Sequence, residues 1–230
     1  MSAMNKLSRD ILHNVKKTYN LIGEEFSKTR QNIWGEFVIF EKLIAKNTKI
    51  ADIGCGNGRF FKFITKKLPK YTGIDNSKTL IKEAKKQFSK HKLKPRFLEG
   101  NILKIPLQTA SQQVASCIAV LHHIPTTKLR KKAVAELARI LKKEGKLLLT
   151  VWNLREQKKY KKNVVKAIWK WLYSFGKHEK RGLIIPWGKE KIPRYYYAFK
   201  EKELDRLLNP HFKILKKKKG KNLIYICEKK

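Results

Sequence analysis

The chain has 230 residues, which is enough for one substantial folded core with a modest appendage. Lysine and arginine number 55 against 18 aspartate and glutamate, a formal net charge of +37. No apolar stretch reaches the roughly 18 residues of a membrane span, and residues 1–10 lack the apolar centre of a secretory signal, so we expect a cytoplasmic protein without a transmembrane segment.

The predicted elements alternate between strand and helix from residue 47 to residue 152. A helix with a loop (6–30) and an amphipathic helix (33–46) come first, as a lid. Strands then follow at 50–53, 71–74, 95–99, 114–120 and 145–152, with helices at 57–67, 77–90 and 127–141 and a turn at 143–145. Such alternation is typical of a parallel sheet.

The end of the chain has a different pattern. Two apolar runs at 211–217 and 221–228 surround Lys219-Gly220, which predicts an antiparallel hairpin. The stretch 155–199 is too long for a bare connection, so we expect a helix at about 161–174 and then a loop covering the substrate. For the apolar residues of that helix, core packing is favoured over base stacking: Trp169, Trp171, Leu172 and Phe175.

A glycine-rich turn follows the first strand, in the form Asp52-Ile53-Gly54-Cys55-Gly56-Asn57-Gly58. Glycines suit this turn because the backbone bends sharply and lies close to a ligand. Asp75 ends the second strand, where a carboxylate can accept both hydroxyls of a ribose. The spacing differs from the G-x-G-x-x-G of dinucleotide folds, whose turn binds a pyrophosphate.

This D-x-G-x-G-x-G pattern resembles the first motif of the class I methyltransferases. The resemblance implies an α/β, Rossmann-like fold with a mostly parallel seven-stranded sheet, a C-terminal antiparallel hairpin and helices on both faces. It also implies S-adenosylmethionine as the cofactor. The cofactor-binding residues that it assigns are Asp52, Gly54, Cys55, Gly56, Asp75, Asn76, Asn101, Ile102 and Val120.

The large positive charge favours nucleic acid as a partner, because lysine and arginine neutralise phosphates. Compositional drift toward lysine and attachment to an anionic membrane surface remain alternatives. The three cysteines, Cys55, Cys117 and Cys227, are far apart and lie in apolar surroundings. They indicate neither a disulfide framework nor a zinc site, so we expect no metal.

The resemblance to class I methyltransferases implies that the methyl group is presented at the carboxyl end of the fourth strand. This end of the strand carries His122 and His123, whose adjacent positions in a turn do not favour shared metal binding. One histidine facing the substrate and a purely structural role are both open. Trp152 and Asn153 follow the fifth strand on the same rim, where an indole and an amide can hold a planar base.

A narrower resemblance rests on Tyr19-Asn20-Leu21-Ile22, residues 26–30, the stretch 118–123, Ile185-Pro186-Trp187 and residues 194–199. These are similar to the wobble-uridine tRNA methyltransferases, of the yeast tRNA methyltransferase 9 type and the methyltransferase domain of AlkB homologue 8. That family esterifies 5-carboxymethyluridine to 5-methoxycarbonylmethyluridine. The resemblance therefore implies a tRNA uridine carboxyl O-methyltransferase that binds the anticodon loop, together with a small zinc-binding activator subunit.

The same resemblance assigns roles at the substrate end of the site. Arg30 and Arg194 would bind and align the carboxylate or a nearby phosphate, and His122 would be a neutral hydrogen-bond partner. His123, Trp152 and Asn153 would contact the substrate, and Tyr195 and Tyr196 would stack on a flipped base or pack in the loop. Three positions depart from the family pattern: Asn101, Gln113 and Tyr197.

We expect one domain over residues 1–230, with a lid (1–46), a cofactor core (47–152), a substrate-covering insertion (153–199) and a last helix with hairpin (200–230). Two other functions remain open. The first is a class I methyltransferase of a small acid or lipid, and the second is a tRNA-binding protein with a decayed methyltransferase site.

Overall fold

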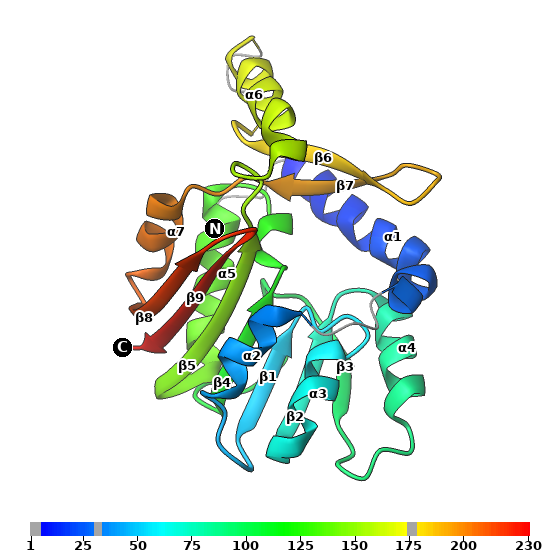
Figure 1. Ribbon diagram of the computed structural model, residues 1–230, viewed down its shortest axis with the longest axis vertical. Helices are drawn as coiled ribbons and strands as arrows, with labels where there is room; N and C mark the ends of the chain where they lie inside the picture. The colour runs from blue at the N-terminus through cyan, green and yellow to red at the C-terminus, as the bar shows by residue number, and fades with distance from the viewer. Residues whose placement is uncertain (1–5, 30–33, 174–178) are drawn as a thin grey trace.

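The computed structural model describes residues 6–29, 34–173 and 179–230. The strands of its main sheet are β1 (Lys49–Ile53), β2 (Lys70–Asp75), β3 (Arg96–Glu99), β4 (Gln112–Ile118), β5 (Leu141–Trp152), β8 (Phe212–Lys219) and β9 (Asn222–Lys229). They lie in the order β3-β2-β1-β4-β5-β9-β8 (Figure 1). Strands β1 to β5 pair in parallel, and β9 runs antiparallel to both β5 and β8. The predicted fold class is confirmed.

Helices cover both faces of this sheet (Figure 1). One face packs against α5 (Thr127–Ile140) and α7 (Glu201–Leu208), and the other against α2 (Gly35–Glu41), α3 (Arg59–Ile64) and α4 (Lys78–Phe88). Short 3-10 turns, η1 (Thr65–Lys67) and η2 (Leu121–His123), follow α3 and β4. None of the helices in the described segments combines the length and hydrophobicity that spanning a bilayer requires.

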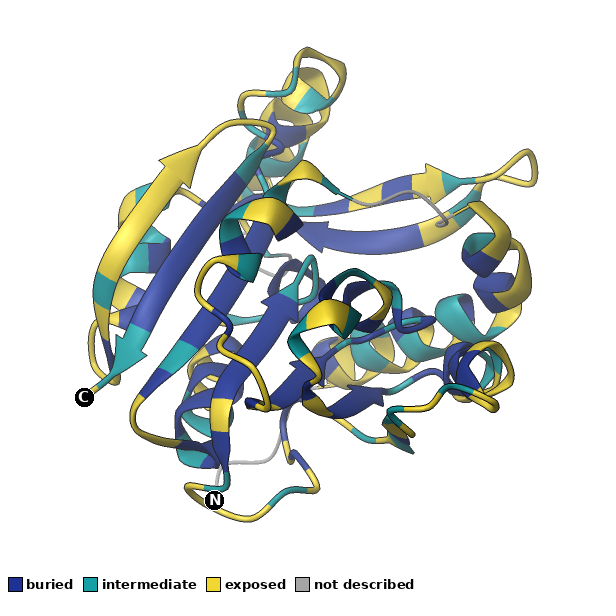
Figure 2. Ribbon diagram, turned by 60° about the horizontal axis from the view of Figure 1, so that its bottom comes forward, coloured by how far each residue is buried: buried dark blue, intermediate teal, exposed yellow. Residues whose placement is uncertain are grey.

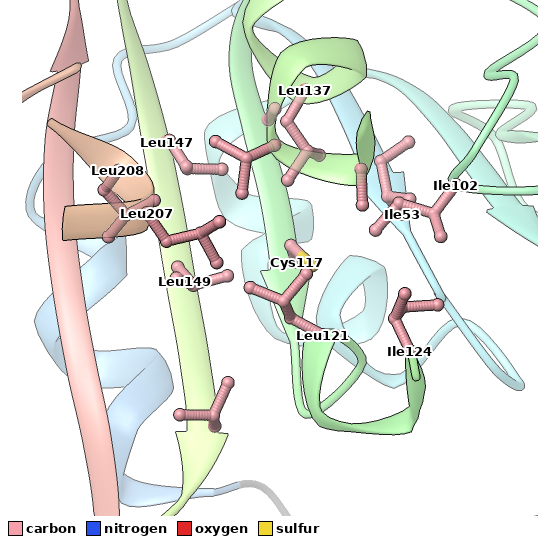
Figure 3. Packing of buried hydrophobic residues seen from close by; sticks show 14 of the residues in the cluster. Ile53, Ile102, Cys117, Leu121, Ile124, Leu137, Leu147, Leu149, Leu207 and Leu208 are labelled. Atoms are coloured by element: carbon pink, nitrogen blue, oxygen red, sulfur yellow. The ribbon is translucent and has the colours of Figure 1, made fainter. Parts of the chain in front are cut away.

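The core consists of two apolar layers because both faces of the sheet are covered. In β5, Leu147 and Leu149 face α7, while Leu148 faces the opposite layer, as the two-residue period of a strand requires. Figure 3 shows Leu147 and Leu149 beside Leu207 and Leu208. Strand β8 differs, since it is an edge strand whose residues are mostly exposed (Figure 2).

Two sequence expectations are corrected by the structure. The predicted loop after the helix α6 (Lys158–Tyr173) contains an antiparallel pair, β6 (Gly182–Trp187) with β7 (Ile192–Tyr197), outside the main sheet. It forms because Leu183 and Ile185 bury one face while Ile184 stays exposed. The predicted turn at 143–145 lies inside β5, as a bulge between the Gln112↔Leu141 and Val114↔Lys146 pairs of the parallel register.

Helix α1 (Lys6–Thr29) lies across the carboxyl edge of the sheet and joins the core to the β6–β7 pair (Figure 1). The Ser77 hydroxyl at the start of α4 donates to Asn20 Oδ1 at 2.9 Å. The Thr18 hydroxyl donates to the Pro193 carbonyl at 3.1 Å. The helix therefore closes the space above the sheet instead of packing against one of its faces.

Buried Arg130 fastens the β6–β7 pair to the core. Its Nη2 donates to Glu179 Oε1 at 2.6 Å, and its guanidinium carbon lies 3.6 Å from the centroid of the Tyr197 ring. The hydroxyl of Tyr195 donates to the other oxygen of Glu179. One carboxylate thus connects α5 with β7.

We expect Arg130→Met to lower the free energy of unfolding by about 3 kcal/mol, because Glu179 would keep a mostly buried charge without its cation. The measurement is urea unfolding monitored by circular dichroism. Lys131→Met, on the exposed side of α5, is the matched control and should change the free energy by less than about 0.5 kcal/mol. Equal stability of the two variants would contradict the role given to Arg130.

Candidate active site

A cavity of about 380 Å³ lies at the carboxyl ends of β1, β2 and β4, where open α/β sheets bind ligands. Helix α1 closes one side of it through Leu12, Val15 and Tyr19. All the residues predicted for cofactor binding line this cavity, and so does His123: Asp52, Gly54, Cys55, Gly56, Asp75, Asn76, Asn101, Ile102 and Val120. The turn and the strand ends are thus assembled as one site.

The glycine turn needs glycine for two different reasons. Gly54 has φ +77°, and a Cβ there would lie 2.1 Å from Val120 Cγ2, so the close approach of β1 and β4 excludes a side chain. Gly56 has φ +56°, and a Cβ there would meet no atom within 4 Å. Space is therefore left open at Gly56, on the wall of the cavity, for a ligand.

Asp75 organises the turn from the neighbouring strand. Its Oδ2 accepts from the Gly56 amide and its Oδ1 from the Ser77 amide, both at 2.9 Å. Burial raises the pKa of this carboxyl, while the backbone hydrogen bonds act in the opposite direction. Each oxygen keeps a further acceptor position, which suits the hydroxyls of a ribose.

Asp52 is a second buried carboxyl in the cavity wall. Its oxygens accept from the Tyr71 hydroxyl at 2.6 Å and the Ser116 hydroxyl at 2.7 Å. Burial raises its pKa to about 6, so the group is ionised at pH 7 but protonated in mild acid. An ionised carboxylate at this depth favours a cationic ligand.

Asn101 closes β3 beside Ile102, and both line the cavity. The Asn101 Oδ1 already accepts from the Leu103 amide at 2.9 Å. One lone pair of that oxygen remains free to accept from an adenine amino group. Gln113 is not at this site: its Oε1 accepts from the Lys49 amide at 2.9 Å.

The two histidines of η2 are placed differently. His123 lines the cavity, with Nδ1 2.7 Å from the Tyr195 carbonyl and Nε2 3.0 Å from the Tyr19 hydroxyl. A carbonyl only accepts, so Nδ1 carries the proton and the hydroxyl donates to Nε2. Burial lowers the pKa of His123 to about 4, which leaves the ring neutral at pH 7.

His122 does not line the cavity, in contrast to its predicted catalytic position. It is buried behind His123, where Nδ1 accepts from the Trp152 amide at 3.2 Å. Burial lowers the pKa of His122 well below its ordinary value. The arrangement brings His123, and not its neighbour, to the site.

The predicted base-holding residues also lie away from the cavity. Tyr196 is buried, with its ring stacked against His122 and Trp152, whose centroids are each 4.9 Å away. The Asn153 side chain donates to the Gly220 carbonyl at 3.0 Å. None of Trp152, Asn153, Tyr195 and Tyr196 lines the cavity, so this geometry does not support their predicted contacts with a base.

Arg194 lies on β7, and Arg30 lies outside the described residues. The Arg194 side chain is 5% exposed, and its Nε has no hydrogen-bond partner. Burial raises the pKa of the Tyr19 hydroxyl, and the nearby Arg194 guanidinium opposes that rise. A buried cation thus stands next to the Tyr19–His123 pair.

Two residues of the cavity were missed by sequence reasoning as site residues. Tyr19 was noted only for its family resemblance, although it hydrogen-bonds to His123. Arg59 begins α3 directly after Gly58, and its guanidinium carbon lies 3.9 Å from the Trp34 ring centroid. The sequence signal that could have identified Arg59 is its position directly after Gly58, the last glycine of the turn. No three His, Cys, Asp or Glu side chains gather as a metal site within the described segments.

The cavity fits S-adenosylmethionine. The open space at Gly56, the acceptor oxygens of Asp75 and the anionic Asp52 suit a ribose and a cationic sulfonium, and Ile74, Leu80 and Ile102 add apolar surface for a purine. We expect Asp75→Ala to weaken S-adenosylmethionine binding roughly tenfold to 100-fold, because charge-assisted hydrogen bonds and the anchor of the turn are removed. Titration calorimetry measures the change.

The control for that substitution is Asp10→Ala, which removes an exposed carboxylate from α1. It should leave the affinity within about twofold, a change of under 0.5 kcal/mol. Unchanged affinity in both variants would overturn the assignment of Asp75.

Binding of S-adenosylmethionine should also weaken as the pH falls from about 7 to about 5. Asp52, with a pKa of about 6, is ionised above this range and protonated below it, and only the anion attracts the sulfonium. Asp52→Asn should bind more weakly at pH 7 and lose most of the dependence. S-adenosylhomocysteine, which has no charge on sulfur, is the control ligand. A pH dependence retained in Asp52→Asn would exclude Asp52 as its source.

The comparisons with known proteins agree with this site. Residues 51–149 match the family model of a methyltransferase domain, Methyltransf_11. The chain is 30% identical over 205 residues to the tRNA (carboxymethyluridine(34)-5-O)-methyltransferase of Schizosaccharomyces pombe, covering 84% of this chain and 86% of that protein. It is 35% identical over 150 residues to tRNA (carboxymethyluridine(34)-5-O)-methyltransferase ALKBH8 of Mus musculus, covering 65% of this chain. It spans only 21–24% of the length of this and two further vertebrate relatives.

Solved structures with low sequence identity share the fold. An S-adenosylmethionine-dependent methyltransferase of Methanosarcina mazei has a TM-score of 0.72 at 23% identity, covering 86% of this chain and 98% of that one. The 1,6-didemethyltoxoflavin-N1-methyltransferase of Burkholderia thailandensis, solved with S-adenosylhomocysteine, has a TM-score of 0.69 at 14% identity, covering 100% and 93%. S-adenosylmethionine is therefore the cofactor. The chain belongs to the class I S-adenosylmethionine-dependent methyltransferases, in the family that includes the tRNA (carboxymethyluridine(34)-5-O)-methyltransferases.

Proposed function

We propose that the protein is a tRNA methyltransferase that esterifies the carboxylate of 5-carboxymethyluridine at the wobble position, giving 5-methoxycarbonylmethyluridine. The names of its relatives support tRNA as the substrate. The net charge of +37 supports a polyanionic partner. A zinc-binding activator subunit and a cytoplasmic location accompany this proposal as predictions.

The burial of Arg194 without an anionic partner among the described residues is the observation that favours a carboxylate as the methyl acceptor. Its buried guanidinium forms no ion pair with any of the described acidic residues, and its Nε has no partner. An unpaired buried cation is costly unless an anion meets it. A substrate carboxylate entering beside Tyr19 would satisfy the guanidinium and be aligned by it.

Tyr19 and His123 fix the polar groups around that position. Because His123 is neutral and accepts the Tyr19 proton at Nε2, the oxygen of Tyr19 is left as an acceptor for Arg194. The β6–β7 pair holds the Tyr195 carbonyl that sets this tautomer. In the proposal, His123 takes the hydrogen-bonding role that the sequence assigned to His122, and Arg194 keeps its own.

The reaction needs orientation more than acid–base help. A carboxylate is already ionised at pH 7, so no residue has to remove a proton. S-adenosylmethionine supplies an electrophilic methyl group when it is bound. The chain positions the acceptor, covers it with α1 and the β6–β7 pair, and excludes water, which is where the rate gain of such a transfer arises.

Mass spectrometry of digested tRNA tests the proposal. The protein is incubated with methyl-deuterated S-adenosylmethionine and tRNA that carries 5-carboxymethyluridine, and the nucleosides are analysed. Label in 5-methoxycarbonylmethyluridine is the expected result. Label in another nucleoside, or only in a small acid or lipid from an extract, would reject the substrate while keeping the methyltransferase. Cofactor binding without any transfer would favour the decayed enzyme.

We expect Arg194→Ala to lower kcat/KM for tRNA methylation roughly 100-fold, because the carboxylate loses its aligning cation. The affinity for S-adenosylmethionine should stay within about twofold, since Arg194 does not line the cofactor cavity. Arg206→Ala, an exposed arginine of α7, is the matched control. Equal rates in the two variants would exclude the proposed carboxylate contact.

A further inference from the structure

Helix α6 has an apolar stripe that nothing in the described structure covers. Val165, Trp169, Leu172 and Tyr173 are 52%, 53%, 49% and 78% exposed. The spacing of these four residues places them on one face of the helix. The expectation that Trp169 and Leu172 pack in the core is therefore wrong.

The helix is already seated by a different face. Val164 is buried with Leu183 and Ile185 of β6, and Tyr160 and Ile168 pack against the same cluster. The exposed stripe is thus a second surface, separate from the one that holds the helix to the β6–β7 pair. In Figure 1, α6 projects beyond the carboxyl edge of the sheet, the edge that carries the cofactor cavity.

The chemistry of the second surface is cationic and aromatic. Helix α6 contains six lysines, all exposed, and no acidic residue. Trp169 and Tyr173 stack on each other with centroids 5.9 Å apart and planes at 25°. Flat rings that remain half or more exposed, together with lysines, are the combination by which proteins hold single-stranded nucleic acid.

A lysine-lined cleft continues this surface at the base of the helix. Its volume is about 600 Å³, and it lies between the start of α6 and the β8–β9 turn. Polar groups form its floor, since Asn153 and Gln157 donate to the carbonyls of Gly220 and Lys221. The cations around it are Lys158, Lys159, Lys219 and Lys221, of which Lys219 pairs with Glu156 at 3.0 Å.

We propose that the exposed stripe of α6 and this cleft form a docking surface for tRNA, with the rings stacking on unpaired bases and the lysines contacting phosphates. The proposal rests on the proposed tRNA substrate. An anionic membrane is the competing occupant, but the flat surface of a bilayer would meet the exposed stripe and not the interior of the cleft. A tRNA suits both parts, because its unpaired bases can stack on the stripe and its phosphates can contact the lysines of the cleft.

The test is binding of a fluorescein-labelled, unmodified tRNA transcript to the full chain, without cofactor, by anisotropy at several salt concentrations. Trp169→Ala with Tyr173→Ala should weaken binding roughly tenfold, because base stacking is removed. The triple change of Lys158, Lys159 and Lys221 to Ala should reduce the slope of log affinity against log salt by about 1 for each phosphate that is no longer neutralised.

Matched controls lie on α4 and α1. Lys85→Ala with Lys86→Ala removes exposed lysines far from α6 in the sequence, and Leu21→Ala removes an exposed apolar side chain. Both should leave tRNA affinity within about twofold, a change of under 0.5 kcal/mol. Unchanged S-adenosylmethionine binding in every variant verifies folding.

Two outcomes would overturn the docking surface. One is tRNA affinity in the stripe and cleft variants equal to that of the controls. The other comes from a parallel assay with phosphatidylserine vesicles: the stripe and cleft variants lose binding to the vesicles while their tRNA affinity is unchanged. Because the transcript carries no methyl acceptor, these results are independent of whether 5-carboxymethyluridine is esterified. Failure of the reaction and failure of this surface can therefore be told apart.

Discussion

The site depends on the hydrogen bonds of one buried carboxylate, Asp75. Its two oxygens hold the Gly56 amide of the glycine turn and the Ser77 amide that starts α4. Ser77 is in turn bonded through its hydroxyl to Asn20 of α1. Three walls of the cavity therefore converge on a single group. Its burial raises its pKa, and the cost of that burial is offset by backbone donors that the fold already needs to satisfy.

The proposed acceptor end of the site is organised by the β6–β7 pair and not by the main sheet. The Tyr195 carbonyl sets the tautomer of His123, and His123 orients the Tyr19 hydroxyl. Glu179 and Arg130 tie the same strand to α5. The core thus supplies the cofactor cavity common to the fold, while an insertion supplies the polar groups that would select the methyl acceptor.

Local patterns predicted which residues line the cofactor cavity, because such patterns report local constraints. Gly54 and Asp75 lie at strand ends, and the order of strands in a parallel sheet brings those ends together regardless of which residues lie on the protein surface. The substrate end was predicted less well. His122 and His123 are adjacent in sequence, and only the packing of η2 decides which ring reaches the cavity. Trp169 has the large apolar side chain expected of a core residue, yet it is exposed because β6 covers a different face of α6.

The fold class and the residues that line the cofactor cavity could be inferred from the amino-acid sequence, because strand–turn–helix units form from contacts between near neighbours. The hydrogen bond by which Asp75 holds the Gly56 amide was not predicted. The burial of Arg194 without a carboxylate partner among the described residues, and the enclosure of Tyr196 by His122 and Trp152, follow only from the folded chain. The uncovered face of α6 likewise emerges only in three dimensions. The burial of a side chain depends on which other parts of the fold pack against it. The residues next to it in the sequence do not determine those contacts.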